Sequence, residues 1–185
     1  MVKLATIQGY LPAVPLAQRL IAPPYDVLDT EEARAMASGN PQSFLHVNKP
    51  EIDLAPETDP YADIVYETGR ANLQSFISNG WLLHDDLSRV YIYAVTMSGR
   101  TQYGVVGGAS VEDYATNKIK KHELTRKKKE EDRTRLTDTQ SANVGPVFLT
   151  YRAQANIDAV VSAVVARSAH IDVVTDDQVR HVVSS

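Results

Sequence analysis

The chain has 185 residues, a formal net charge of −4 and no cysteine. A domain of this length buries a core without covalent staples, and the lack of cysteine excludes thiolate catalysis, Cys-ligated metal sites and disulfide frameworks. No apolar run reaches the roughly 18 residues of a membrane span, and the N-terminus has no signal-peptide pattern. We therefore expect a single cytoplasmic domain over residues 1–185 that does not contact a membrane.

The charge is unevenly distributed along the chain. Between Lys118 and Arg135 lie nine basic and four acidic residues, a net of +5, so the rest of the chain carries −9. A basic segment in an acidic protein is a candidate anion site. The segment has no aromatic residue among its cations, which makes nucleic-acid binding an unfavoured function.

The first half of the chain predicts helices separated by turns. Prolines between Gln8 and Tyr25 exclude a long regular element there. Asp29 and Glu32 form a capping-box pattern, which predicts a helix over 30–38 ending at Gly39. The other elements expected in this half are a strand at 43–47 and a helix at 60–78, with Asp59 as its cap and Gly80 after its end.

The second half alternates strand and helix patterns. Two β-rich runs flank the turn at Ser98-Gly99-Arg100 and predict a hairpin. The expected elements are strands at 89–97 and 101–109, a helical turn at 110–114, a charged helix at about 125–141, a strand at 147–151, a helix from Asn156 to about 167, and a hairpin of 171–175 with 179–183. The predicted fold class is α/β (α+β), a mixed sheet with flanking helices.

The charged helix allows two interpretations. Opposite charges lie four residues apart in three pairs, Arg126 with Glu130, Lys127 with Glu131 and Lys128 with Asp132, as in a solvated helix with ion pairs. However, four cations crowd the predicted first turn, where the helix dipole disfavours each by roughly 0.3–1 kcal/mol. Free backbone N–H groups beside those cations would suit a bound phosphate. This second interpretation requires the helix to begin near Thr125.

Two further segments carry candidate catalytic side chains. His122 and Glu123 could act as general acid or base beside the cations, and solvated side chains on a surface loop are the alternative. The double proline at 23–24 could fix Asp26 as a base or a magnesium ligand, although a turn packed by Tyr25 fits equally well. His46 follows Asn40 and Ser43, and a lone histidine of this kind is more often structural.

Four motifs together resemble a known family. They are Ala22-Pro23-Pro24-Tyr25-Asp26-Val27, then Gly39-Asn40-Pro41 with Ser43-Phe44-Leu45-His46-Val47, then Lys120-Lys121-His122-Glu123 with Thr125 and Lys129-Glu130-Glu131-Asp132-Arg133, and Gly145-Pro146-Val147-Phe148. In this order they resemble the domain of unknown function 1015 family over residues 22–151. The resemblance implies a prokaryotic protein with a ParB/sulfiredoxin-like nucleotide-binding fold. Relatives of that fold include free-serine kinases, which transfer a phosphoryl group from ADP or ATP to the serine hydroxyl.

The resemblance also implies that this chain is part of a longer protein. Family members are usually much longer and carry an Asp-Gly-His-His-Arg motif beyond the position of Ser185. We therefore expect this chain to be the N-terminal part of a longer protein, with a fold that is incomplete at its C-terminus and inactive alone.

The expected function is a nucleotide- or phosphate-binding module for phosphoryl transfer to a small-molecule hydroxyl in the full-length protein, with ADP or ATP and Mg²⁺ as cofactors. The predicted phosphate-binding residues are Lys121, Thr125, Arg126, Lys129 and Arg133, and the predicted catalytic residues are Glu123, Asp26 and His122. The alternative is a non-catalytic ParB-like regulatory or interaction module that binds nucleotide as a switch. The sequence leaves open whether the chain forms a homodimer.

Overall fold

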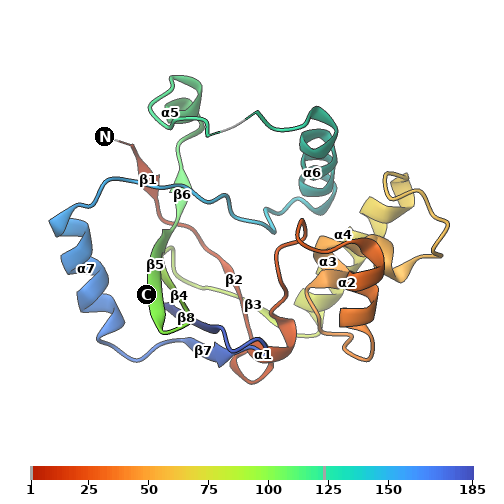
Figure 1. The fold of residues 1–185 in the computed structure, drawn as a ribbon, viewed down its shortest axis with the longest axis horizontal. Helices are drawn as coiled ribbons and strands as arrows, with labels where there is room; N and C mark the ends of the chain where they lie inside the picture. The colour runs from red at the N-terminus through yellow and green to blue at the C-terminus, as the bar shows by residue number, and fades with distance from the viewer. Residues whose placement is uncertain (1, 123) are drawn as a thin grey trace. The chain divides into compact units, whose positions relative to one another are not determined.

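The computed structural model describes residues 2–122 and 124–185, and Figure 1 shows its ribbon. The chain divides into two compact units, each formed from segments that are distant in sequence. Unit 1 comprises Met1–Gln18, His84–Leu124 and Leu149–Ser185, and unit 2 comprises Arg19–Leu83 and Thr125–Phe148. The chain therefore passes between the units repeatedly, and no single linker separates them.

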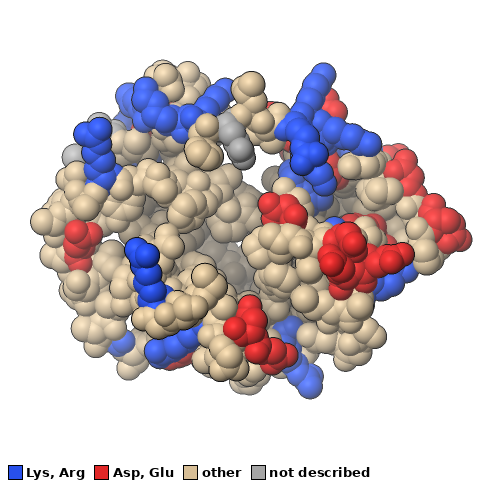
Figure 2. All heavy atoms as spheres, in the orientation of Figure 1, with Lys and Arg blue, Asp and Glu red and all other residues tan. Residues whose placement is uncertain are grey.

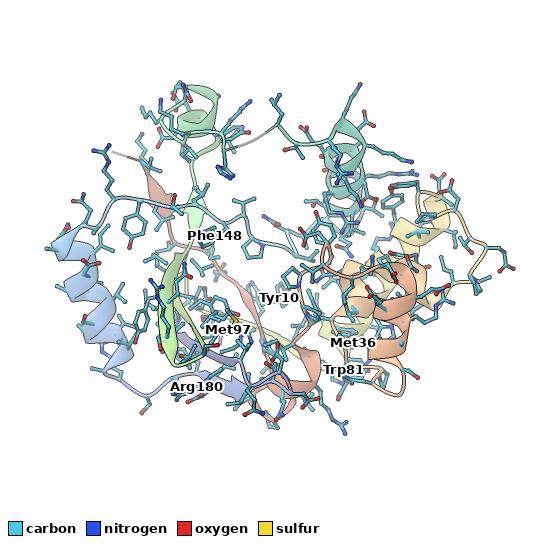
Figure 3. The ribbon with its side chains drawn as sticks, in the orientation of Figure 1. Tyr10, Met36, Trp81, Met97, Phe148 and Arg180 are labelled. Carbon is cyan, nitrogen blue, oxygen red and sulfur yellow. The ribbon has the colours of Figure 1, made fainter. Side chains whose placement is uncertain are left out.

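Unit 1 contains a four-stranded sheet in the order β5-β4-β8-β7. Its strands are β4 (Tyr91–Met97), β5 (Arg100–Val106), β7 (Ile171–Val174) and β8 (Arg180–Ser184). The predicted hairpin turn is confirmed, because Ser98 and Gly99 both have positive φ, 51° and 74°, as a two-residue I′ turn requires. The C-terminal hairpin is also confirmed. It joins the first because β8 pairs with β4, so that Met97 and Arg180 lie at the same end of the sheet (Figure 3).

The α+β class is confirmed, but the expected mixed sheet is not what this unit forms. Each neighbouring pair of the four-stranded sheet is antiparallel, as is the short pair of β1 (Leu4–Ala5) with β6 (Gly108–Ala109). The reason is that β4–β5 and β7–β8 are joined by hairpins, whereas parallel neighbours need long crossover connections. The remaining elements in or beside unit 1 are β2 (Tyr10–Pro12), η1 (Val14–Leu16), α1 (Ala17–Leu20), β3 (Leu82–His84), α5 (Val111–Ala115) and α7 (Ala155–Val165).

The helical turn α5 appears as predicted, and a buried carboxylate anchors it. Asp113 is only 2% exposed, and it accepts hydrogen bonds from the backbone N–H of Lys3 and from Nζ of Lys118, both at 2.8 Å. The bond from Lys118 is the main reason that the pKa of Asp113 lies below its ordinary value. The start of the basic segment is thus fixed to the N-terminal part of the chain, and its first lysine already has a structural partner.

Two predictions in the C-terminal part are wrong in detail. Residues 147–151 form no strand; Val147 and Phe148 are 77% and 76% exposed in an irregular segment. An apolar run becomes a strand only where a partner strand and a surface to pack on are available, and this run has neither in the described chain. The helix α7 is capped at Gln154 instead of Asn156, and none of its residues is fully buried.

Unit 2 is mostly helical. Its elements are α2 (Thr30–Ala37), α3 (Leu45–Asn48), η2 (Pro50–Asp53), α4 (Asp63–Ser78) and α6 (Lys127–Gln140). The capping box is confirmed, because the Glu32 N–H donates to Asp29 Oδ1 at 2.8 Å and the Asp29 N–H donates to Glu32 Oε2 at 2.9 Å. Gly39 and Gly80 follow helices, as predicted, and both have the left-handed conformation, with φ of +73° and +67°.

The predicted strand at 43–47 is instead the helical turn α3. Leu45 and Val47 are both completely buried although they lie only two residues apart. This is possible because α3 contacts α2 and η2 as well as α4, so opposite sides of one turn are enclosed. A short apolar run does not by itself distinguish a strand from a buried helical turn.

The helix α4 begins at Asp63, later than the predicted start at 60. The carboxylate of Asp59 accepts the N–H of Tyr61 at 3.0 Å and so stabilises a turn before the helix, while the N-cap residue Ala62 offers no side-chain bond. Past this turn α4 packs against α6. Gly69 lies in this tightly packed region, where an added Cβ would lie 3.0 Å from Pro50 Cγ of η2 and 3.2 Å from Leu136 Cδ1 of α6.

We expect Gly69→Ala to destabilise the protein. Alanine would gain about 1 kcal/mol of helix propensity, but Pro50 and Leu136 are fully buried and cannot move aside, and overpacking of this kind costs typically about 1–3 kcal/mol. Urea denaturation should show a net loss of roughly 1 kcal/mol. The exposed α4 residue Gln74 gives the control, since Gln74→Ala should change stability by less than about 0.5 kcal/mol. A more stable Gly69→Ala variant would show that the α4–α6 contact is loose.

Candidate functional site

The first turn of α6 concentrates exposed cations at a helix N-terminus. The helix begins at Lys127, close to the start that the anion interpretation requires, and its N-cap Arg126 makes no side-chain cap hydrogen bond. Lysine and arginine side chains gather over this helix in Figure 2. Thr125, which could have capped the helix, lies one residue before the N-cap. Leading backbone N–H groups of α6 are therefore left without a side-chain acceptor beside several positive charges.

The predicted ion pairs of this helix are mostly absent in the structure. Lys127 lies 3.6 Å from Glu131, with both side chains largely exposed. Lys128 instead lies over the ring of Tyr61, 4.1 Å from its centroid. Across residues 2–122 and 124–185, no carboxylate forms an ion pair with Arg126 or Lys129. The solvated-helix interpretation thus accounts for one of its three pairs.

A buried carboxylate lies further along α6, where this helix packs against α4. Asp132 is 8% exposed and accepts a hydrogen bond from the Tyr66 hydroxyl at 2.9 Å. Its second oxygen receives two bonds from Arg133, from Nε at 2.9 Å and from Nη2 at 2.8 Å. Burial, with the bond to Asp132 as second cause, raises the pKa of Tyr66 well above its ordinary value, so the phenol remains a hydrogen-bond donor.

The Arg133 guanidinium makes two further contacts in unit 2. Its Nη1 donates to the carbonyl of Asn48 at 3.1 Å, and its carbon lies 4.3 Å from the centre of the Tyr25 ring. This one side chain therefore brings together three of the sequence motifs, those at 22–27, at 43–47 with the following Asn48, and at 129–133. Asp26 follows Tyr25 directly, and its side chain is exposed.

His46 forms a second polar centre in unit 2. Its Nδ1 lies 2.7 Å from Asp53 Oδ1, and its Nε2 lies 3.2 Å from the carbonyl of Asn40. Both ring nitrogens face acceptors, so the doubly protonated ring fits best, and the bond to Asp53 is the main reason that its pKa is raised. Asn72 donates to the Asp53 carboxylate at 2.7 Å and to the His46 carbonyl at 2.8 Å. His46 therefore has a structural role, as the sequence analysis expects for a lone histidine.

The predicted site residues are divided between the two units. Thr125, Arg126 and Lys129 lie together around the start of α6, Arg133 lies one turn further along the helix, and Asp26 lies in the loop that Arg133 contacts through Tyr25. Lys121 and His122 belong to unit 1 and are exposed, with Lys121 Nζ 5.1 Å from the Tyr114 ring centre. Glu123 lies outside the described residues. The catalytic and phosphate-binding roles of all these residues stay predictions.

Several residues that build these centres escaped sequence analysis. Tyr66, Asn48 and Asn72 lie in or beside helices and belong to no chemical motif, and their partners are distant along the chain. The sequence indicates Tyr25 only as a residue that packs a turn. The sequence gives little indication of Asp53, because a spacing of seven residues from a histidine predicts no contact between the two side chains outside a known helix.

The structure offers no dedicated metal cage in the part of the chain that it describes, since no three His, Cys, Asp or Glu side chains there converge to hold an ion. A magnesium ion that arrives with a nucleotide needs only one or two carboxylates in addition to the phosphates, and the exposed Asp26 fits that requirement. Among residues 2–122 and 124–185, no helix combines the length and apolar character needed to cross a bilayer.

Comparison with known proteins gives one result. The family model described as protein of unknown function (DUF1015) matches residues 5–185, nearly the whole chain. No curated protein and no solved structure matches the chain.

We expect Arg133→Ala to be strongly destabilising and Arg126→Ala to be nearly neutral. Removing Arg133 leaves the buried Asp132 carboxylate without its cation, which costs about 3–5 kcal/mol in comparable pairs, whereas Arg126 is an exposed N-cap residue. Thermal and urea unfolding of both variants would measure the difference. The double variant Arg133→Ala with Asp132→Asn should recover part of the loss. Equal effects of the two single substitutions would contradict a structural role for Arg133.

The free energy of unfolding should depend on pH in part through the protonation of His46. Because its folded pKa is raised above the ordinary 6.5, its contribution is fully present below the pKa of the unfolded chain and is lost as pH rises through the folded pKa. Between about pH 5 and 8, the difference in unfolding free energy between wild type and His46→Gln should shrink as pH rises.

His181 supplies the control of opposite sign. Its Nδ1 lies 2.6 Å from the Tyr93 hydroxyl, and burial lowers its pKa. Wild type should therefore gain stability over His181→Gln as pH rises. If the two variants changed the pH profile in the same direction, the protonation states assigned here would be wrong.

Proposed function

We propose, from the premise that this chain belongs to the DUF1015 family, that it binds the phosphate groups of a nucleotide at the first turn of α6 and contributes to phosphoryl transfer to a small-molecule hydroxyl. One observation carries the proposal: exposed cations without carboxylate partners, Arg126 and Lys129 in the described chain, flank an uncapped helix N-terminus. A ParB/sulfiredoxin-like fold, which rests on the motif resemblance, is part of this proposal. A cytoplasmic location, which rests on the sequence composition and pattern, is also part of it.

The electrostatics of α6 favour a bound anion. Positive side chains at the N-terminus of a helix are each disfavoured by the helix dipole. A phosphate would reverse that effect, because it accepts bonds from backbone N–H groups and neutralises the cations at the same point. The arrangement is thus costly in the free protein and favourable in the anion-bound one.

Catalysis of phosphoryl transfer depends mainly on positioning and on stabilising charge. In this proposal Arg126 and Lys129 bind phosphate oxygens, with Thr125 beside them. Asp26 accepts the proton of the attacking hydroxyl or holds magnesium, and the contact of Tyr25 with Arg133 keeps its loop against α6. Lys121, His122 and Glu123 keep the roles that the charge pattern of the sequence predicts for them, phosphate binding for the lysine and acid–base or orienting roles for the other two.

The alternative is a regulatory or interaction module that binds nucleotide without catalysis. The same cationic turn supports it, since binding alone needs no acceptor or base. The two functions differ in turnover. We therefore separate binding from chemistry in the test.

We expect ATP and ADP to bind with an affinity that falls as salt rises. In calorimetric titrations, Arg126→Ala and Lys129→Ala should each weaken binding about fivefold, equivalent to roughly 1 kcal/mol per charge–phosphate contact. Arg70→Ala is the matched control, because Arg70 is an exposed cation on α4 of the same unit. Unchanged affinity in both α6 variants would refute the phosphate site.

Turnover decides between the two functions. The full-length protein would be incubated with ATP or ADP and serine, and with CTP as a comparison nucleotide, while phosphoserine is measured. Product formation that Asp26→Ala abolishes without changing nucleotide affinity supports the kinase. Binding without turnover under all these conditions supports the regulatory module.

A further inference from the structure

A shallow hollow of about 430 Å³ lies in unit 2 at the C-terminal end of α2, the helix that carries Met36 in Figure 3. It is formed by the end of α2 and the turn after it, together with α3 and η2, and none of its residues belongs to α6. Its polar lining comes from Arg34, Ser38, Asn40 and His46. No Asp or Glu is among the described residues that line it, so its wall is positively charged.

Arg34 is the main binding group of this hollow. It is half-buried, and its Nη2 donates to the carbonyl of Glu51 at 3.2 Å. The Glu51 carboxylate does not neutralise it, because that group pairs with Lys49 at 3.1 Å and both of these side chains are nearly buried. In the described part of the chain no carboxylate forms an ion pair with Arg34. A guanidinium has five N–H donors, so several are left to bind a ligand.

His46 adds charge to the same wall. Its nitrogens are taken by Asp53 and by the Asn40 carbonyl, so the ring offers no free donor. The Asp53 carboxylate balances the charge of the ring, and it is held in turn by the neutral Asn72 amide. Lys49 and Glu51 on the neighbouring η2 cancel one another. Arg34 therefore sets the net charge of the hollow.

The end of α2 provides the Ser38 hydroxyl, and two of its backbone carbonyls that could repel an anion are already hydrogen-bonded. Ser38 is exposed and lies four residues after Arg34, so the two side chains share one face of the helix end. Carbonyl groups at a helix C-terminus disfavour an anion, but those of Ala35 and Ala37 already accept the N–H groups of Ser38 and Asn40 at 3.2 and 3.0 Å. An anion could approach Arg34 and Ser38 without meeting free carbonyls of those two residues.

We propose that this hollow binds a small oxyanion, a carboxylate or inorganic phosphate, through Arg34 and Ser38 beside the charged ring of His46. The site is independent of the phosphate site on α6 and goes beyond the nucleotide-binding function. Its shallow, open form suits a small ligand in place of a nucleotide.

The ring protons of His46 report directly on this site. In NMR titrations of the full chain at constant ionic strength, acetate or phosphate should shift the His46 signal in a saturable way and raise its pKa, because a nearby anion favours the charged ring. Chloride at the same ionic strength should produce neither effect. Saturation by acetate alone identifies a carboxylate ligand, by phosphate alone a phosphate ligand, and by both the shared oxyanion chemistry.

Variants place the effect at Arg34. Arg34→Gln should abolish saturation, and Arg34→Lys should weaken it, because lysine keeps the charge but loses the planar fork. Arg70→Gln and the pair Arg126→Ala with Lys129→Ala should leave it unchanged. Equal shifts with chloride, a response that does not saturate in wild type, or saturation that persists in a folded Arg34→Gln variant would each overturn the proposal. The wild-type titration remains decisive if Arg34→Gln fails to fold.

Discussion

The buried carboxylate of Asp132 is the constraint on which unit 2 depends. A charge removed from water must be paired and hydrogen-bonded, and here Tyr66 and Arg133 meet that requirement. Once Arg133 is fixed by Asp132, its remaining surfaces hold the Asn48 carbonyl and the Tyr25 ring. One ionic contact within α6 thereby connects this helix to α4, α3 and the proline-rich loop. Lys128 has no ion pair with Asp132, four residues further on, because this acid is turned inward to Tyr66 and Arg133.

Local chemistry made much of the fold predictable. The capping box at Asp29 and the hairpin turn at Ser98-Gly99 depend on residues that are neighbours in sequence, and both form as expected. The strand expected at 43–47 failed because burial on both sides of a short run depends on three other elements. Composition showed no boundary between the two units, because each is assembled from separated segments and no linker stretch exists to be recognised.

In the candidate site as well, features that depend on neighbouring residues were predictable, and contacts between distant residues were not. Sequence identified the exposed cations of α6, since their position in the first turn follows from the helix start alone. It could not reveal the contacts that hold Arg133, because Asn48 and Tyr25 lie far along the chain from α6. The centres of charge around Asp132, His46 and Asp113 each include a partner far along the chain, Tyr66, Asn72 and Lys3 respectively. The assignments of Lys121, His122, Glu123 and Asp26 rest on motifs and await the turnover measurement.

The interleaving of the units constrains the order in which the protein can assemble during synthesis. The helix α4 leaves the ribosome well before α6, so Tyr66 and Gly69 have no α6 partners until the unit 1 segment His84–Leu124 has been translated. Until then the α4 face that later receives Leu136 is open to water or to a chaperone. Any nascent chain that stops before 127 would thus hold a helix with an uncovered apolar side, and a slow or stalled ribosome in this region would prolong that exposure.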